Sequence, residues 1–500
     1  MRKRVHLPRH FFSTALFLYL VPLIFLIDKF NEYIGSVSYQ TVINCLLLYW
    51  LGAFLFAVGF WRIYRDDIKA HLMTSVLFVC NFYYGPFQDY LQVITHDGLI
   101  SRYRFLLPVF ILVIILVFYL IKKLPVIPLR IGKIFSIGCI LLAGLKIYML
   151  GPALENADPT KVVRNPIKME KGSNWPEIYV LVADGYAGRA ELKDLMQFDN
   201  DSFYAALRDK GFWVADSSHS NYIVTPLSMA SFYSMDYLTL SGLFTQDVLD
   251  ARKRIFNNPF QSFLRTKGYQ FRNFSIFHRR ENKVLLDVFR YDGLQLINQE
   301  TLLMHLTNLL ESITNNKEDI FELNEEYKAL IRRSNNFVFD ALQHDVPDST
   351  GSPRFTYAHI LGPHFPYLND SLGNPRPDEL TDKNDRFSRD HYISYIKGMN
   401  KLFLASIDSI QQRTNRKAII LFISDHGFRQ FREPQEKQYY YSNLLSIYLP
   451  DGKYDRFYHR MSNVNFLRAF LNQQFGQKFT MLPDSMITHQ ASPPVKKKSR

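Results

Sequence analysis

Two aspartates and a histidine stand at the ends of two apolar segments that lie far apart in the sequence. Ile178 to Gly185 reads IYVLVADG, and Ala418 to Phe428 reads AIILFISDHGF. Apolar, β-branched runs of this kind predict strands buried on both faces, and ligands of open α/β sheets sit at the carboxyl ends of strands. Taken alone, either aspartate is more often a turn former or a helix N-cap. Together, Asp184, Asp425 and His426 predict one site suited to Zn2+ or Mn2+.

A threonine followed by a proline opens a predicted helix that runs from Thr225 to Tyr233. Proline suits the first helical turn, where free backbone N–H groups and the positive end of the helix dipole favour a phosphate. A hydroxyl at this place could be a metal-activated nucleophile, or an ordinary N-cap, which is the commoner role. Asn221, four residues earlier, could donate a hydrogen bond to a phosphoryl oxygen or merely shape the loop.

Two further histidines lie on and after a predicted buried strand, Phe355 to Leu361. His364 is held between Pro363 and Pro366, and a histidine in such a loop could donate to a phosphate oxygen or protonate a leaving group. His359 lies on the strand itself, which favours a structural role, and substrate contact is the alternative. Two histidines five residues apart could also bind metal.

Positive charge could serve anion binding, but it does not indicate a nucleic-acid partner. The chain carries a formal net charge of +13, much of it in loops beside apolar segments and in the tail 491–500. No nucleic-acid-binding motif is present, and we expect no such partner. Arg429, Arg432 and Lys437 follow the Asp-His pair and could bind an anionic headgroup or acceptor. A solvated loop explains them equally well.

From Pro176 onwards, strand and helix signals alternate along the chain. This alternation predicts an α/β domain with a mostly parallel sheet sandwiched by helices. Besides the strands already described, shorter strands are expected at 212–215, 269–276 and 446–449. Helices are expected at 202–210, 225–233, 302–313, 322–342, 391–411 and 464–475. Segment 241–350 has the least recognisable content, and it is a candidate for acceptor specificity.

The first third of the chain is crowded with apolar residues. Five segments of roughly 17–20 residues are long enough to span a bilayer as helices. They are 11–27, 42–60, 71–87, 105–121 and 134–150. The third is the weakest candidate, because it is interrupted by Asn81, Tyr83, Tyr84 and Gly85.

Basic residues alternate between the predicted loops. Segments 62–69 and 122–133 are basic like the N-terminus, whereas 28–41 is poor in basic residues; 88–104, with its two arginines, fits less well. The positive-inside rule therefore predicts a cytoplasmic N-terminus, and five crossings would put everything after Gly151 outside. We expect four parts: a five-helix transmembrane domain (1–151), a linker (152–175), an extracytoplasmic domain (176–490) and a basic tail (491–500).

The order of the motifs resembles the sulfatase-like branch of the alkaline phosphatase superfamily. The motifs are Asp-Gly after a first strand, Asn-Tyr-x-x-Thr with Ser228 and Ser231 following, Pro-His-x-Pro, and Ser-Asp-His-Gly after a late strand. With its N-terminal spans, the chain looks most like membrane-anchored phosphoglycerol and phosphoethanolamine transferases, such as lipoteichoic acid synthase and lipid A phosphoethanolamine transferase. The resemblance covers the architecture of the whole chain but only these four motifs in residues.

The resemblance implies roles for particular residues. One divalent ion would be held by Asp184, Thr225, Asp425 and His426, with Thr225 as the nucleophile, and His364 matches the family's substrate-contacting histidine. The first ligand is often glutamate in the transferases, whereas this chain has an aspartate. That departure blurs the distinction between a transferase and a phosphodiesterase.

The implied activity is a two-step transfer at a bacterial inner or cell membrane, with the catalytic domain periplasmic or extracellular. Thr225 would attack a membrane phospholipid, diacylglycerol would leave, and the phospho-threonine would pass phosphoglycerol or phosphoethanolamine to a surface glycan or lipid. A sulfatase is disfavoured, because the nucleophile position holds neither cysteine nor serine. A metal-dependent phosphodiesterase and a non-catalytic membrane-tethered scaffold stay open as alternatives.

Overall fold

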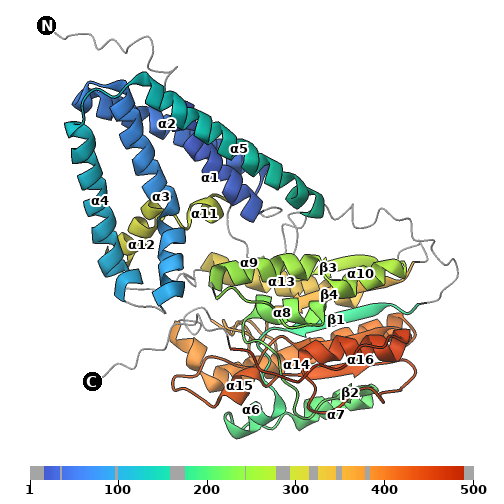
Figure 1. The fold of residues 1–500 in the computed structure, drawn as a ribbon. Coiled ribbons are helices and arrows are strands. Elements are labelled where there is room, and N and C mark those ends of the chain that lie inside the picture. The colour runs from blue at the N-terminus through green and yellow to red at the C-terminus, as the bar shows by residue number, and fades with distance from the viewer. Residues whose placement is uncertain are drawn as a thin grey trace. The chain divides into compact units, whose positions relative to one another are not determined.

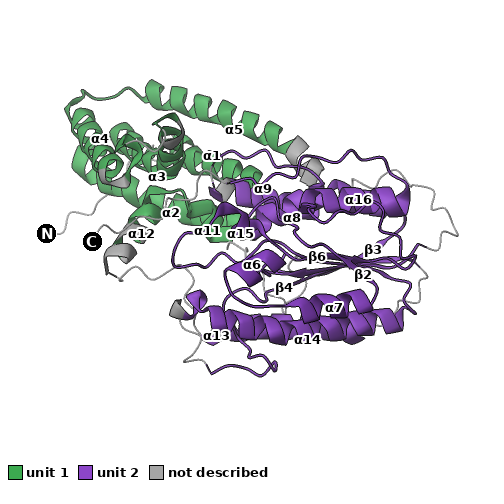
Figure 2. Ribbon diagram, turned by 90° about the horizontal axis from the view of Figure 1, so that it is seen from below, with its two compact units in different colours: residues 1–165, 290–319 green, residues 166–289, 320–500 purple. Residues whose placement is uncertain are grey.

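The computed structural model describes residues 16–33, 37–95, 99–157, 175–242, 244–277, 293–314, 325–344, 352–377 and 383–488. The chain forms two compact units (Figure 2). The first unit combines Met1–Asn165 with Arg290–Asp319, and the second combines Pro166–Phe289 with Ile320–Arg500. The domain boundaries expected from the sequence stay a prediction, to which the structure adds that 290–319 groups with the N-terminal helices.

The first unit is built on five long helices, and each predicted span falls on one of them, except that residues 11–15 of the first span lie outside the described residues. They are α1 (Leu16–Glu32), α2 (Tyr39–Tyr64), α3 (Asp67–Thr95), α4 (Tyr103–Lys123) and α5 (Leu129–Ala157). Within the described residues, three stretches are long and apolar enough to cross a membrane: Tyr39–Tyr64, Phe105–Lys123 and Leu129–Gly151. The chain thus has candidate spans on α2, α4 and α5, and five crossings stay a prediction.

The first and fifth helices run in the same direction. Near their N-termini, the Phe17 N–H donates to Ser136 Oγ over 3.2 Å. Near their C-terminal halves, Lys146 Nζ lies 2.7 Å from Asp28 Oδ1. Two parallel helices separated by three others in sequence are what an odd number of crossings requires.

The intervening helices alternate in direction. The Tyr64 hydroxyl donates to Phe118 O over 3.1 Å, which joins the C-terminal ends of α2 and α4. Lys69 Nζ donates to Leu124 O, which brings the start of α3 to the same place. This end of the helices, here called the basic end, carries the lysines and arginines of both basic loops: Arg62, Arg65, Lys69, Lys122, Lys123, Arg130 and Lys133.

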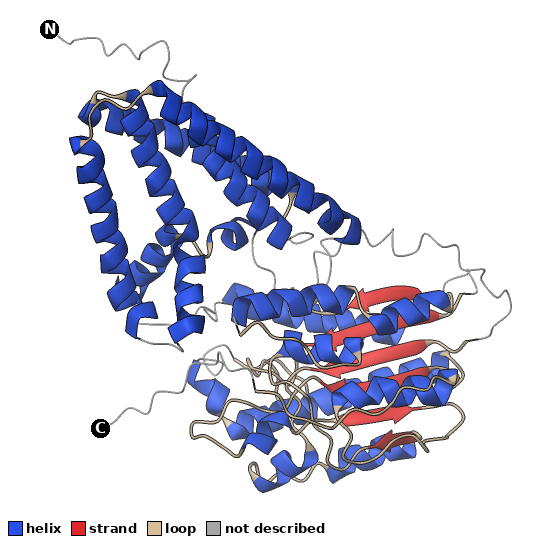
Figure 3. Cartoon of the chain, viewed as in Figure 1, coloured by secondary structure: helices blue, strands red, loops and turns tan. Residues whose placement is uncertain are grey.

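The second unit is organised around a six-stranded sheet with the order β2-β6-β5-β1-β4-β3 (Figure 3). The strands are β1 (Ile178–Ala183), β2 (Phe212–Val214), β3 (Gln270–Phe274), β4 (Arg354–Ile360), β5 (Ile419–Ser424) and β6 (Leu445–Tyr448). Strands β3, β4, β1 and β5 are parallel neighbours, as predicted, whereas β6 is antiparallel to both β5 and β2. The sheet is therefore mixed.

Helices cover both faces of this sheet (Figure 1). One layer contains α8 (Thr225–Ser234), α9 (Phe244–Phe256), α10 (Pro259–Thr266) and α16 (Asn463–Phe475). The other contains α7 (Asp201–Asp209), α13 (Glu325–His344) and α14 (Arg389–Arg413). Shorter helices are α6 (Arg189–Asp194) and α15 (Lys437–Tyr441).

The central strand explains why the sheet has two cores. In β1, Ile178, Val180 and Val182 pack into the layer that contains α8, and the alternate residues pack into the layer that contains α14. Every residue of β1 is buried, as the continuous apolar run predicted. Each fully buried aliphatic side chain contributes about 1.5–3 kcal/mol, so such a strand belongs at the centre of the sheet.

Candidate metal and nucleophile site

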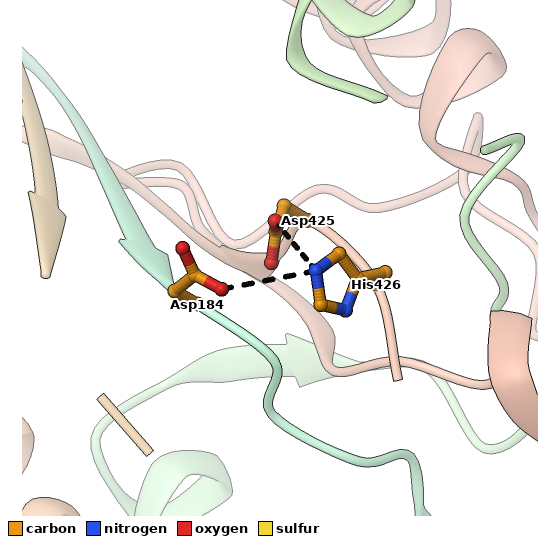
Figure 4. Close-up of side chains that lie close together, drawn as sticks. All are labelled: Asp184, Asp425 and His426. Carbon is orange, nitrogen blue, oxygen red and sulfur yellow. Dashed lines mark ion pairs between the residues drawn. The ribbon is translucent and has the colours of Figure 1, made fainter. Parts of the chain in front are cut away.

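The carboxyl ends of β1 and β5 bring the predicted metal ligands together (Figure 4). The two strands pair in parallel with Ala183 opposite Ser424, so the next residues, Asp184 and Asp425, lie side by side. Asp184, Asp425 and His426 are all buried, and one ligand atom from each lies within 4.8 Å of the others. Within the described residues this is the one such cluster of His, Cys, Asp and Glu side chains.

The imidazole of His426 presents a lone pair to this cluster. Its Nδ1 lies 2.7 Å from the Gly427 carbonyl oxygen, which only accepts, so Nδ1 carries the hydrogen. Its Nε2 lies 3.2 Å from Asp425 Oδ2 and 3.7 Å from Asp184 Oδ1. Burial, reinforced by the charge of Arg429, lowers the pKa of His426 well below its usual value. A neutral imidazole in this tautomer is a metal ligand.

The oxygens that face His426 have no hydrogen-bond partner. Asp184 Oδ1 and Asp425 Oδ2 are both buried and unpaired. Two carboxylate oxygens and an imidazole lone pair that face one another repel, and each of the two buried, unsatisfied oxygens costs about 1–3 kcal/mol. A divalent cation satisfies all three at once, and carboxylate and imidazole donors suit Zn2+ and Mn2+. The donor set therefore fits a divalent metal ion.

The two carboxyl groups respond oppositely to their surroundings. Burial, with the negative charge of Asp184 next, raises the pKa of Asp425. Burial opposes ionisation of Asp184 too, but the electrostatic attraction of His364 and the hydrogen bond of His359 outweigh it and lower the pKa of Asp184. The pair therefore carries a permanent negative charge at Asp184 and a second one that a cation would stabilise.

Thr225 lies at this cluster and at the start of α8, as predicted. Its Oγ1 is 3.2 Å from His426 Nε2, and because that nitrogen lacks a hydrogen, the threonine hydroxyl donates to it. Thr225 is buried, and Pro226 occupies the first turn of the helix. The hydroxyl oxygen thus sits beside the three acceptors and at a helix N-terminus, where a phosphoryl group would meet free N–H groups.

His359 is buried behind Asp184. Its Nε2 lies 3.4 Å from Asp184 Oδ2, and its Nδ1 lies 2.9 Å from the Tyr357 hydroxyl. With the hydrogen on Nε2, the imidazole faces the carboxylate and Tyr357 donates to Nδ1. Such partners orient metal-binding carboxylates in many metalloenzymes. This geometry fits a structural role, whereas the predicted substrate contact of His359 stays a prediction.

His364 and Arg429 lie on the rim of a small pocket beside His426. The His364 Nδ1 donates to Phe365 O over 2.6 Å, which leaves its Nε2 as an acceptor, 3.4 Å from Arg429 Nη2. Arg429 is also held by the carbonyl oxygen of Ile223. Aromatic rings complete the lining: Phe365, Tyr367, Tyr392 and Phe428. An arginine and a histidine at a pocket with apolar walls can bind an anionic group attached to a carbon skeleton.

Asn221 is engaged elsewhere in the second unit. Its Oδ1 accepts from the Val464 N–H over 2.8 Å, and its Nδ2 donates to Ser485 O over 3.0 Å. These bonds tie the loop before α8 to the start of α16. Substrate binding by Asn221 stays a prediction, and the contacts of its side chain support the loop-shaping alternative.

Several residues of the quoted motifs hold the site in place, in roles that the sequence did not assign. The Ser228 hydroxyl donates to Asp425 O over 2.5 Å, and the Ser424 hydroxyl donates to His426 O over 2.6 Å. The Gly185 N–H, at a φ of +66° that favours glycine, donates to Asp425 Oδ1 over 2.9 Å. A side chain at Gly427 would collide with the Ser442 carbonyl oxygen. Only the fold shows that these groups support the ligands.

The sequence matches no protein-family model and no curated protein. Among solved structures, the zinc complex of the C-terminal periplasmic domain of EcEptC from Escherichia coli is similar, with 12% identity, a TM-score of 0.38, and coverage of 61% of this chain and 84% of that one. The same domain of phosphoethanolamine transferase EptC from Campylobacter jejuni has 12% identity, a TM-score of 0.33, and coverage of 60% and 89%. A phosphonate monoester hydrolase of Agrobacterium radiobacter has 13% identity, a TM-score of 0.32, and coverage of 60% and 74%.

These similar structures are enzymes of the kinds that the sequence motifs resemble, and they include sulfatases as well. Because the TM-scores lie below 0.5, the function is inferred from the geometry of the site alone.

Proposed function

We propose that the chain is a membrane-bound, metal-dependent transferase that moves a phospholipid-derived headgroup phosphate, phosphoglycerol or phosphoethanolamine, through a phospho-threonine at Thr225. The acceptor would be a glycan or lipid at the surface of a bacterial inner or cell membrane. The catalytic unit would face the periplasm or the exterior.

One observation carries the proposal: a threonine hydroxyl at a helix N-terminus lies 3.2 Å from an imidazole nitrogen that itself faces two unpaired buried carboxylate oxygens. This combines a nucleophile, a cation site and an anion-binding helix end. A purely structural cluster would pair its carboxylates with donors. The candidate spans in the same chain suit a donor substrate that is a lipid.

The four residues at the site would have distinct roles in the reaction. Asp184, Asp425, His426 and Thr225 would hold Zn2+ or Mn2+, which when bound supplies positive charge at the phosphoryl oxygens and lowers the pKa of the threonine hydroxyl. Thr225 Oγ1 forms a bond to phosphorus as the bond from phosphorus to the diacylglycerol oxygen breaks. The threonine proton passes to solvent.

His364 would exchange protons with the diacylglycerol oxygen that leaves and the acceptor oxygen that enters, and Arg429 would bind the phosphoryl group. His364 Nε2 is an acceptor in the structure, so the imidazole would first take up a proton there from solvent and then give it to the diacylglycerol oxygen. In the second step Nε2 would take a proton from the acceptor hydroxyl as that oxygen attacks the phospho-threonine. Thr225 Oγ1 leaves in this second step and is regenerated. Arg429 binds the phosphoryl oxygens through its guanidinium group.

The test uses the full chain in lipid nanodiscs that contain a headgroup-labelled phospholipid and Zn2+ or Mn2+. Intact mass should show a covalent adduct on the wild type and none on Thr225→Ala, and the added mass would identify the headgroup. Thr225→Ser should keep the adduct, since serine offers the same hydroxyl.

Three results would contradict the transfer mechanism. An adduct that persists in Thr225→Ala would assign the nucleophile elsewhere. Headgroup released into water, without an adduct or a modified acceptor, would favour a metal-dependent hydrolase. A wild-type protein that binds no divalent metal and turns over no lipid would favour a non-catalytic scaffold.

A further inference from the structure

A segment in the middle of the sequence leaves the catalytic unit and packs with the N-terminal helices. It contains α11 (Gly293–Asn298) and α12 (Leu302–Thr314), which belong to the first unit. We call residues 293–314 the returning hairpin. It lies between β3 and α13 in sequence, so the chain must come back to the sheet after it.

The returning hairpin contacts α3 at the residues that interrupt the third predicted span. The Gly85 N–H donates to Glu300 O over 2.9 Å, and the Leu303 N–H donates to Asn81 Oδ1 over 3.0 Å. A side chain at Gly85 would overlap the Glu300 backbone. The buried Lys29 of α1 pairs with the Glu300 carboxylate. The polar residues that weaken this span thus form the dock for the hairpin.

One face of α12 packs inward. Leu302 is buried in a cluster with Tyr84, Leu106 and Leu107 of α3 and α4. A neighbouring side of the helix is apolar as well: Leu303 is 66% exposed and Leu310 is 61% exposed. They are seven residues apart, two helical turns, and therefore lie on one side of the helix, about a quarter turn from Leu302. Exposed leucines beside a buried stripe of the same helix need a second apolar environment.

The neighbouring helix indicates what that environment is. Helix α4 is a candidate membrane span, and before its terminal lysines its exposed side chains are mostly apolar. They include Val109, Ile111, Leu112, Val113, Ile115 and Leu116. Helix α12 packs beside the start of this helix through Leu302, so its exposed leucines lie next to a membrane-facing helix. Membrane lipid is the environment that suits the exposed side chains of both α4 and α12.

The described residues on either side of the segment that carries the returning hairpin pack within the second unit. The ring of Phe277, the last described residue before it, is 5.9 Å from the ring of His359, close to the candidate metal site. After it, Tyr327 packs against the core cluster that contains Phe277. The chain thus leaves the second unit for the returning hairpin and comes back to it.

We propose that the returning hairpin is a lipid-docking element: Leu303 and Leu310 lie in the bilayer interface, and the anchored hairpin gives the catalytic unit access to a lipid-borne phosphodiester. The access to a lipid-borne phosphodiester rests on the proposed function. The surface formed by Leu303 and Leu310 binds lipid rather than another protein.

The first experiment locates the hairpin. Cysteines at 303 or 310, in full-length protein whose Cys45, Cys80 and Cys139 are replaced by alanine, receive a nitroxide label in nanodiscs. Collisions with oxygen should exceed collisions with a water-soluble nickel chelate, as at Leu112→Cys on α4. Leu372→Cys, whose native leucine is 70% exposed in the second unit, is the aqueous control. Labels at 303 and 310 that behave like the one at 372 would overturn the proposal.

The second experiment separates lipid access from chemistry. In Leu303→Asp/Leu310→Asp, headgroup transfer from a bilayer phospholipid should fall by about tenfold or more, equivalent to about 1.4 kcal/mol. Hydrolysis of bis(4-nitrophenyl) phosphate, a water-soluble phosphodiester, should stay unchanged. The matched control Leu372→Asp should alter neither rate.

The outcomes distinguish the two proposals. Equal lipid transfer by wild type and double variant would overturn the role of the hairpin. A parallel loss with both substrates would also overturn it, because the substitutions would then act on the catalytic unit itself. A wild type inactive on both substrates would refute the proposed function alone, and the label experiment would still decide whether the hairpin binds lipid.

Discussion

His426 Nε2, Asp184 Oδ1 and Asp425 Oδ2 are three hydrogen-bond acceptors that the fold holds face to face. The Thr225 hydroxyl donates to His426 Nε2, but no hydrogen bond reaches the two carboxylate oxygens. The neighbours that fix their positions, Ser228 and Ser424, act on the backbone of the ligand loop and leave the lone pairs unopposed. A site of this kind favours cation binding at the expense of stability in the absence of the cation.

Replacing one acceptor should therefore have opposite effects with and without metal. Asp425→Asn should raise the free energy of unfolding of chelator-treated protein by about 1–2 kcal/mol, because an amide can donate where a carboxylate cannot. It should also abolish the rise in Tm that Zn2+ or Mn2+ gives the wild type. Thermal unfolding of the full chain in detergent, with and without metal, measures both effects.

The control is Asp408→Asn, which breaks an ion pair with Lys210 in which the aspartate side chain is 57% exposed. Exposed pairs contribute little, so neither Tm should change appreciably. A metal-free Asp425→Asn protein less stable than the wild type would show that the carboxylates are satisfied without a cation.

His359 should act through Asp184. Replacing it with glutamine should lower the affinity for Zn2+ by about 10–100-fold, the usual effect of losing a group that orients a metal ligand. Competition with a chromogenic chelator measures this affinity. His344→Gln, on the exposed end of α13, is the control and should change nothing. Unchanged metal affinity with a raised KM would instead support the substrate contact predicted from the sequence.

At the scale of elements, α6 supports the ligand loop through a buried carboxyl group. Glu191 Oε2 accepts from the Phe428 N–H over 3.3 Å, and Glu191 Oε1 is buried without a partner. Burial raises the pKa of Glu191 well above its usual value of about 4.5, so the folded protein keeps this proton to a higher pH than the unfolded chain does.

This buried carboxyl group makes stability depend on pH in one direction. A carboxyl group with a raised folded-state pKa contributes stability that is fully present below the unfolded pKa and is lost as pH rises through the folded pKa. The Tm of the wild type should therefore fall more between pH 5 and pH 8 than that of Glu191→Gln. Glu433→Gln, at an exposed position, should follow the wild type. If Tm changes with pH in the same way in Glu191→Gln and in the wild type, the raised pKa of Glu191 is contradicted.

The sequence predicted the elements whose pattern is local. The runs before Asp184 and Asp425 became the adjacent strands β1 and β5, because a continuous apolar strand needs burial on both faces. The predicted helices at 225–233 and 464–475 became α8 and α16 within one residue at each end. The motif order also predicted that Thr225 lies beside the Asp-His pair at the end of β5.

Features that depend on distant partners were not predictable. Glu191 reads as a surface residue of a short helix, and only the fold places Gly427 and Phe428 against it. Helix α12 was predicted, but its association with α3 depends on a backbone contact at Gly85 that no periodicity encodes. The antiparallel direction of β6 follows from its chain connections rather than from its four residues.

At the scale of the whole molecule, the alternating helix directions gather positive charge at the basic end of the first unit. The opposite end receives Asp28 and Lys146, and the returning hairpin contacts Lys29 there. Since the hairpin belongs to the chain that follows α5, this end and the second unit are expected to face the same side of the membrane. The positive-inside rule predicts that this side is extracytoplasmic.

Cysteine labelling tests this topology. In a background without native cysteines, a membrane-impermeant maleimide added to intact bacterial spheroplasts should label Leu372→Cys and not Lys123→Cys. Both should react after lysis, which controls for accessibility. Labelling of position 123 in intact spheroplasts would reverse the orientation.

The order of strands in the sheet also bears on how the protein is made. β1 leaves the ribosome soon after α5, yet the two strands that flank it, β4 and β5, are encoded only at 354–360 and 419–424. During synthesis, the apolar IYVLVA segment of β1 therefore has no pairing strand on either edge until β4 and β5 have been made. A strand in this state is prone to aggregation. The N-terminal helices are complete by then, and the hairpin at 293–314 emerges before β4. Nascent chains of this protein should accordingly depend on holdase chaperones on the far side of the membrane until β5 has been delivered.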